Sequence, residues 1–149
     1  MLSSGRLLSC LLLSACISST GDDGADLPLP PDGTLAVELT TDQASYPLGG
    51  SASVRVTNTT NEVIGWGGCE DELERWLGDR WVQLARVHFP CPLIELSLDP
   101  GASQTLPFDL RAAGVPGTYR LRRPFWTLGR ETGPKSYRRS NSFVLTSFR

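Results

Sequence analysis

Catalytic motifs and histidine are scarce in this chain. It has one histidine in 149 residues. It contains no phosphate-binding loop, no dinucleotide fingerprint, no Gly-x-Ser-x-Gly elbow and no His-Glu-x-x-His helix. No Asp or Glu stands in a recognisable catalytic setting. We therefore expect a protein that is not an enzyme and that uses no cofactor and no metal.

A long hydrophobic run is also missing. The most apolar stretch is Leu7–Leu13, which is interrupted by Ser9 and is far shorter than the roughly 20 residues that span a bilayer. Arg6 precedes it, and Ser14 and Ala15 follow it. This order of charged, apolar and small residues is typical of a secretory signal. We predict a signal peptide over residues 1–15 and no membrane-spanning helix there.

The end of this segment carries a more specific motif. Leu13-Ser14-Ala15-Cys16 resembles the lipobox of bacterial lipoproteins. The resemblance implies that the signal is cut after Ala15 and that Cys16 is acylated with palmitate-type chains. The protein would then be lipid-anchored and extracytoplasmic in the cell envelope. Ile17 stands where an Asp would retain it, which implies the outer membrane if the source is Gram-negative. The alternative is an ordinary signal with an incidental cysteine.

The chain also lacks a large net charge, which is −2 at neutral pH. Residues 16–100 hold 4 basic and 14 acidic residues, whereas residues 101–149 hold 9 basic and 2 acidic residues. A nucleic-acid-binding domain would be basic throughout its binding face, so we expect no nucleic-acid partner. Because the two halves interleave in a sandwich, we expect much of this asymmetry to cancel in space.

The chain divides at about residue 33. Residues 17–33 are small, acidic and proline-containing, a composition that does not bury enough apolar area to order itself. We interpret residues 16–33 as the lipidated cysteine and a flexible linker. Residues 34–149 form a domain of the size of one immunoglobulin-like sandwich.

Alternation of apolar and polar residues begins at Thr34. Leu35–Thr40 and Ala52–Thr57 alternate with period two, which predicts half-buried strands. Further strands are expected at 103–110, 117–123 and 141–147, and a turn at 46–50. Pro107 interrupts the first of these three, so we expect it to lie at a sheet edge. Short strands separated by Gly, Pro and Asn predict an all-β, antiparallel, Greek-key sandwich of about seven to eight strands.

Residues 70–77 fit two structures. Early acidic residues and helix formers favour a helix start. Gly78-Asp79, between two apolar-containing runs, favours a two-residue hairpin. In that hairpin Trp76 faces Trp81 as a cross-strand aromatic pair. We predict the hairpin.

The order of turns and core positions resembles a known family. The motifs are Tyr46-x-x-Gly49, Val54–Asn58, Leu73-Glu74 with Gly78–Val82, Leu98–Ser103 and Pro116–Arg120. They are similar to a bacterial immunoglobulin-like domain found in small lipoproteins and, less closely, to an intracellular proteinase-inhibitor family. The resemblance implies the fold and carries no catalytic residues. Tyr119 stands where a tyrosine corner is expected, with its hydroxyl bonded to the main chain upstream.

Two cysteines remain in the domain once Cys16 is acylated. An even pair in an exported domain is most simply a disulfide, so we predict a bond between Cys69 and Cys91. It would close a 23-residue loop and contribute about 3 kcal/mol. A zinc site that also uses His88 is the alternative, although it lacks a fourth ligand.

A basic segment with two aromatic residues is the candidate binding patch. We predict that it spans the last connection between strands and takes an anionic partner, such as an anionic glycan or an acidic envelope protein. Its residues are Arg122, Arg123, Phe125, Trp126, Arg130, Arg138 and Arg139. The alternative is a solvated hairpin with Trp126 packed on the sheet, in which Glu70, Asp71, Glu72 and Glu74 supply the counter-charge.

These observations favour a membrane-anchored binding or interaction module. Membrane lipid would be its partner through Cys16, and an envelope protein or glycan would be its partner through the domain. A proteinase inhibitor that acts through the loop 86–95 is the first alternative, and an envelope enzyme without a known motif is the second.

Overall fold

The computed structural model describes residues 29, 31–84, 94–130 and 135–147. Within these ranges every regular element is a strand. The strands are β1 (Val37–Thr41), β2 (Ser45–Pro47), β3 (Ser51–Asn58), β4 (Ile64–Gly67), β5 (Glu72–Trp76), β6 (Trp81–Gln83), β7 (Glu95–Leu98), β8 (Ser103–Asp109), β9 (Gly117–Thr127), β10 (Ser136–Arg139) and β11 (Phe143–Thr146). The described residues contain no helix long and apolar enough to cross a membrane.

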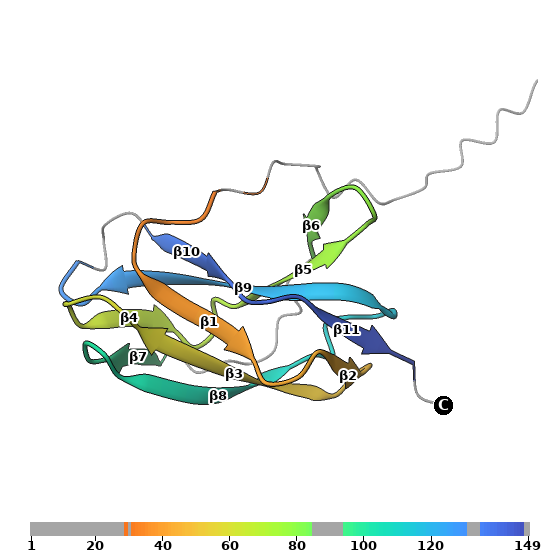
Figure 1. Cartoon of the computed structure of the whole chain (residues 1–149), viewed down its shortest axis with the longest axis horizontal. Helices are drawn as coiled ribbons and strands as arrows, with labels where there is room; N and C mark the ends of the chain where they lie inside the picture. Colours follow the sequence, from red (N-terminus) through yellow and green to blue (C-terminus); the bar gives the residue numbers. More distant parts are fainter. Residues whose placement is uncertain (1–28, 30, 85–93, 131–134, 148–149) are drawn as a thin grey trace, which may run out of the picture.

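The strands form two sheets that pack face to face (Figure 1). One sheet has the order β1-β3-β8, and the other has the order β2-β11-β9-β4-β7, with β5, β6 and β10 joined to its middle. The chain therefore passes between the sheets several times, at each step from β1 to β4 and again before and after β8, as in immunoglobulin-like sandwiches. The prediction of an all-β sandwich is confirmed. Its pairs are antiparallel except for β2 with β11, which is parallel.

The predicted turn at 46–50 begins later than expected. Ser45–Pro47 form β2, and the turn follows, closed by a bond from the Gly50 amide to the Pro47 carbonyl. Pro47 is tolerated because β2 lies at a sheet edge and needs no donor there. Pro107 is tolerated for the same reason, because it lies in β8, an edge strand that pairs only with β3.

The structure has more strands than predicted because two long strands are broken beside β9. β4 and β5 pair with one side of β9, and β10 and β11 pair with the other. The first break follows Gly67, whose carbonyl accepts a turn bond from Glu70. The second lies at Ser140, whose hydroxyl oxygen accepts the Leu121 amide. β9 therefore runs unbroken through the centre of this sheet, whereas the chain on each side of it is divided into two strands.

The core lies between the two sheets and is rich in aromatic residues. Trp66 packs against Phe125 and Tyr119 against Phe143, with ring centroids 5.7 Å and 6.4 Å apart. Alternate residues of β3 face these rings, so Val54 is fully buried. The period-two pattern at residues 52–57 therefore marked the core face correctly.

The expected tyrosine corner is present. The Tyr119 hydroxyl donates a 2.6 Å hydrogen bond to the carbonyl of Val115. Burial of the ring raises the pKa of Tyr119. This bond fixes the chain entering β9, the strand that carries Arg120, Arg122 and Arg123.

A second tyrosine packs beside this corner, since the rings of Tyr46 and Tyr119 both contact Phe143. The Tyr46 hydroxyl donates a 2.5 Å bond to Asp42, which also accepts the Ser53 amide. The bond from Tyr46 is the main reason why the pKa of Asp42 lies below its ordinary range. Burial in turn raises the pKa of Tyr46.

Candidate functional site

The basic segment is not an exposed patch. Arg122, Arg123, Phe125 and Trp126 all belong to β9, and their exposed fractions are 2%, 3%, 0% and 8%. The prediction that they form a binding surface between strands is wrong on this point. The segment does form a hairpin, since β10 pairs with β9. Its side chains, however, are occupied by partners within the domain.

The partners of the arginines are carboxylates of β5. Glu74 is fully buried and accepts the Nε of Arg120 at 2.6 Å and the Nε of Arg139 at 3.1 Å. Glu72 accepts Nη1 of Arg122 at 2.6 Å. These pairs join the acidic and basic halves of the sequence across adjacent strands. The alternative in which the acidic residues near 70–74 supply the counter-charge is confirmed.

Arg123 points to the other face of the sheet. Its guanidinium makes two bonds of 2.5 Å to the carboxylate of Asp71, and it lies 5.9 Å from the Trp66 ring. A bidentate pair of this kind fixes both partners strongly. Arg122 and Arg123 therefore lie on opposite faces of β9 and do not act as one cationic surface.

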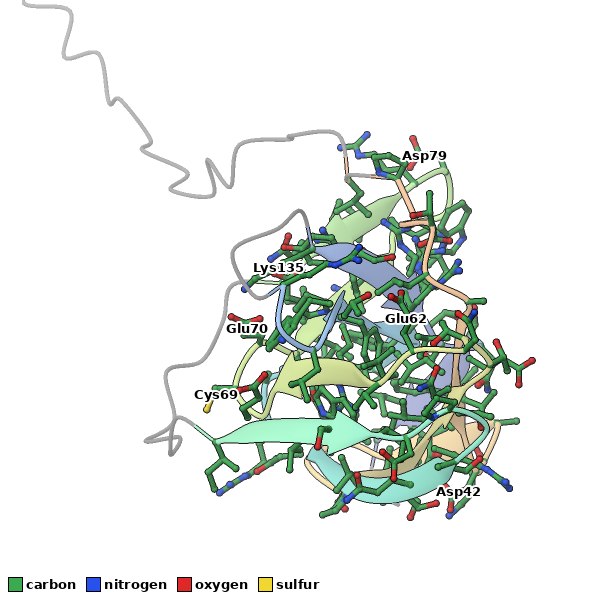
Figure 2. The ribbon with its side chains drawn as sticks, turned by 90° about the vertical axis from the view of Figure 1, so that its left-hand side faces the viewer. Asp42, Glu62, Cys69, Glu70, Asp79 and Lys135 are labelled. Atoms are coloured by element: carbon green, nitrogen blue, oxygen red, sulfur yellow. The ribbon has the colours of Figure 1, made fainter. Side chains whose placement is uncertain are left out.

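Trp126 is held in place from several sides. Its Nε1 donates a 3.1 Å bond to Glu95, and the ammonium of Lys135 lies 5.5 Å from its ring. Lys135 also pairs with Glu70 at 2.5 Å. Gly65 lies so close that an added Cβ would stand 2.7 Å from the indole nitrogen. Figure 2 labels Lys135 and Glu70 close together on this side of the molecule. Trp126 is part of the packing.

The remaining basic residues of the segment do not restore a patch. Arg130 is exposed, with 74% of its side chain accessible, and lies 3.9 Å from Glu62. Arg138 donates to the Leu35 carbonyl, and Arg139 pairs with Asp32 in addition to Glu74. Each arginine thus has a local partner, and the cations are spread over both faces of the sheet.

Among the residues that the structure describes, the most exposed aromatic residue lies elsewhere, on the hairpin of β5 and β6. This hairpin is present as predicted: Leu77 donates to the Arg80 carbonyl, and Trp76 pairs with Trp81. It projects from β9 on the side away from the three-stranded sheet (Figure 1). Trp76 and its neighbour Leu77 are 37% and 48% exposed. Adjacent exposed apolar residues on a projecting turn are unusual, since turns favour Gly, Asn, Asp and Pro.

The two indole rings form a supported platform. The centroids of Trp76 and Trp81 are 5.4 Å apart with an interplanar angle of 54°. The guanidinium of Arg120 lies 4.0 Å from the Trp81 centroid, in cation–π contact. Arg120 is itself bonded to the buried Glu74. We call Trp76, Leu77 and Trp81 the tryptophan platform; the buried charge network positions its inner ring.

Polar side chains border the platform. Asp79 and Arg80, at the turn, keep 73% and 54% of their side chains exposed and lie 3.6 Å apart. Figure 2 places Asp79 at the opposite end of the molecule from Asp42. Gln83 is exposed on β6 and accepts Arg122 at 3.5 Å through its carbonyl oxygen. The hairpin that carries the exposed ring thus also carries an exposed carboxylate and guanidinium at its turn and an exposed amide on β6.

Sequence reasoning found the tryptophan pair and missed its exposure. The signal was present in Trp76-Leu77-Gly78-Asp79-Arg80-Trp81, where an apolar Leu77 occupies a position next to the turn. Gly78 has φ +100° and Asp79 follows it, as a tight hairpin requires. A tight turn at the tip of a hairpin leaves the residues beside it outside the core. The side chains of Trp76 and Leu77 therefore face solvent or a partner.

Several predicted residues fall outside the described part of the chain. These are Cys16, the signal peptide, Cys91, His88 and most of the loop 86–95. Cys69 follows β4 and is not a free thiol. Its pairing with Cys91 stays a prediction. Among the residues that the structure describes, no cluster of three His, Cys, Asp or Glu side chains is placed to hold a metal ion.

Comparison with known proteins assigns no family to this chain. No protein-family model matches the chain. No curated protein matches its sequence. Among solved structures it is similar to PapD-like domain 7 of human CEP192, at 15% identity and a TM-score of 0.41, over 100% of this chain and 98% of that one. It is also similar to a β-glucosidase from Listeria innocua, at 20% identity and a TM-score of 0.32, over 97% of this chain and 22% of that one.

These values do not transfer an activity to this chain. The chain spans about a fifth of the length of the Listeria enzyme. The immunoglobulin-like arrangement follows from the strand order above.

Proposed function

We propose that this chain is a lipid-anchored lipoprotein of the bacterial cell envelope whose sandwich is a non-enzymatic binding module. Leu13-Ser14-Ala15-Cys16 supports the anchor. The absence of recognised catalytic motifs in the sequence supports a binding role over catalysis. The tryptophan platform is the observation that carries the proposal, because it is an exposed aromatic surface on a projecting hairpin.

The platform replaces the basic segment as the proposed binding surface. Trp126 and its arginines already have partners inside the domain. Trp76 and Leu77 are exposed at the tip of the hairpin. The ring of Trp76 packs on Trp81, which contacts Arg120, and Arg120 is bonded to the buried Glu74. A surface that is exposed and pre-organised loses little entropy on binding.

The anchor is tested on the full chain produced in a bacterium. Intact-mass measurement of the membrane fraction should show a mature chain that begins at Cys16 and carries two or three acyl chains. Cys16→Ala should leave the precursor uncut. Cys10→Ala, the matched control, should mature normally. A soluble product without lipid would overturn the anchor.

The binding surface is tested by photo-crosslinking in intact envelopes. A photoreactive amino acid is placed at Leu77 or, as a control, at Val144, which is 42% exposed on β11. Position 77 should give discrete adducts that position 144 does not give. Equal labelling at both positions, or none at 77, would show that the platform is not the binding surface.

A further inference from the structure

We propose that the tryptophan platform binds a β-linked oligosaccharide, with one pyranose ring stacked on Trp76. This inference rests on the proposed function, because it names the ligand class of the same surface. A pyranose ring with equatorial hydroxyl groups has a flat face of C–H bonds and a rim of hydroxyl groups. Its recognition needs an exposed aromatic ring with polar side chains at the edge of that ring.

Trp76 supplies the ring. It is 37% exposed, and its ring packs against that of Trp81 with the centroids 5.4 Å apart. Trp81 is fixed by Arg120 at 4.0 Å, and Arg120 by Glu74 at 2.6 Å. The exposed indole therefore packs on a neighbour that is already fixed before any ligand arrives, which lowers the entropic cost of stacking. Burying its apolar face against the sugar removes area from water.

The border of the platform supplies hydrogen bonds. The Asp79 carboxylate accepts bonds from hydroxyl groups, and the Gln83 amide both donates and accepts them. Both residues are exposed; Asp79 lies in the turn two residues before Trp81, and Gln83 lies on β6 two residues after it. A ring on Trp76 would thus have acceptors and donors near its rim.

The size of the platform favours a sugar over a protein. A stable protein interface buries about 800 Å² on each partner and uses roughly 20–30 residues a side. The tip offers two exposed large apolar side chains, Trp76 and Leu77, followed by the charged pair Asp79 and Arg80. This area suits one or two sugar rings. A protein partner is the outcome that the test below distinguishes.

The test is calorimetric and fluorimetric titration of the full lipidated chain, in a detergent that is not a glycoside. The probes are chitotetraose and cellotetraose, which share β1,4-linked flat rings and differ in their acetamido groups. At least one should bind and alter tryptophan emission. Trp76→Ala should weaken binding roughly tenfold or more, because a lost stacking contact is worth about one such factor. Trp76→Phe should retain part of the affinity.

Controls separate lost binding from lost folding. Val144→Ala removes an apolar side chain with a similar exposed fraction on another strand, and it should bind like the unaltered chain. Trp76→Ala should keep its near-ultraviolet circular dichroism from the buried core rings. If it does not, Trp76→Phe alone decides, and it must bind more weakly than the unaltered chain.

The outcomes distinguish this inference from the proposed function. Failure of both oligosaccharides to bind, or equal binding by Trp76→Ala, overturns the sugar as ligand. If position 77 nevertheless gives specific protein adducts in envelopes, the binding module stands and its ligand is a protein. If position 77 gives no adduct and neither sugar binds, both proposals fall.

Discussion

Glu74→Gln isolates the contribution of the buried charge network. The substitution keeps the shape of the side chain and removes the charge that faces Arg120 and Arg139. These two guanidinium groups are bonded to Glu74 at 2.6 Å and 3.1 Å, and their side chains are only 20% and 12% exposed. Arg122, whose Nε lies 3.9 Å from Glu74, keeps its bond to Glu72.

The magnitude follows from burial. Removing one partner of a buried ion pair leaves an uncompensated charge and costs about 3–5 kcal/mol. Because Glu72 still neutralises part of the cluster, we expect the lower end, about 3 kcal/mol. For a domain of this size, with a urea m-value of about 1.5 kcal/mol/M, the unfolding midpoint should fall by roughly 2 M.

The assay is urea unfolding of the full chain, followed by tryptophan emission. Glu38→Gln is the matched control, because Glu38 is exposed on β1, and its midpoint should hardly change. A double mutant with Arg120→Met should cost less than the sum of the single changes, since the two residues are in contact. A loss below about 1 kcal/mol for Glu74→Gln, or strict additivity, would refute the assignment of Glu74 as the centre of the network.

Three further outcomes are expected. Trp126→Ala should lower the free energy of unfolding, measured by calorimetry, by about 3–5 kcal/mol, as expected for a buried aromatic residue. A variant as stable as the unaltered chain would show that the ring is not part of the core. The pKa of Asp42 is lowered in the folded state, chiefly by Tyr46, so its stabilisation is present above the unfolded pKa and lost as pH falls through the folded value. Asp42→Asn should accordingly flatten the acid limb of a stability profile, and an unchanged limb would contradict this. Cys69 and Cys91 should appear as one disulfide-linked peptide in a non-reducing digest and should hold no stoichiometric zinc; free thiols would contradict the pairing.

Features that depend on neighbouring residues could be predicted from the sequence. Period-two alternation located β3 and its buried face because side chains in a strand alternate between faces. Gly78-Asp79 located the β5–β6 hairpin because Gly adopts the positive φ that a tight turn needs. The Tyr119 corner depends on a carbonyl four residues away. In each case the determining contact lies within a few residues along the chain.

Exposure depended on tertiary structure. Arg122 and Arg123 read as a basic patch because their partners, Glu72 and Asp71, lie 50 and 52 residues away in the chain. Pairing of β5 with β9 brought the carboxylates to the arginines. The same pairing placed Arg120 under Trp81 and left Trp76 exposed at the tip.

The sequence by itself determined that the chain alternates as a sandwich, that a tryptophan pair closes one hairpin and that acidic residues lie in one half and basic residues in the other. Only the tertiary structure decided which aromatic ring meets solvent, because burial is a property of what two distant strands bring together. In the sequence Trp76 follows Arg75, and Trp126 comes three residues after Arg123. Trp126 is covered by Glu95 and Lys135 and supported at Gly65, while Trp76 lies beyond the end of the charge network.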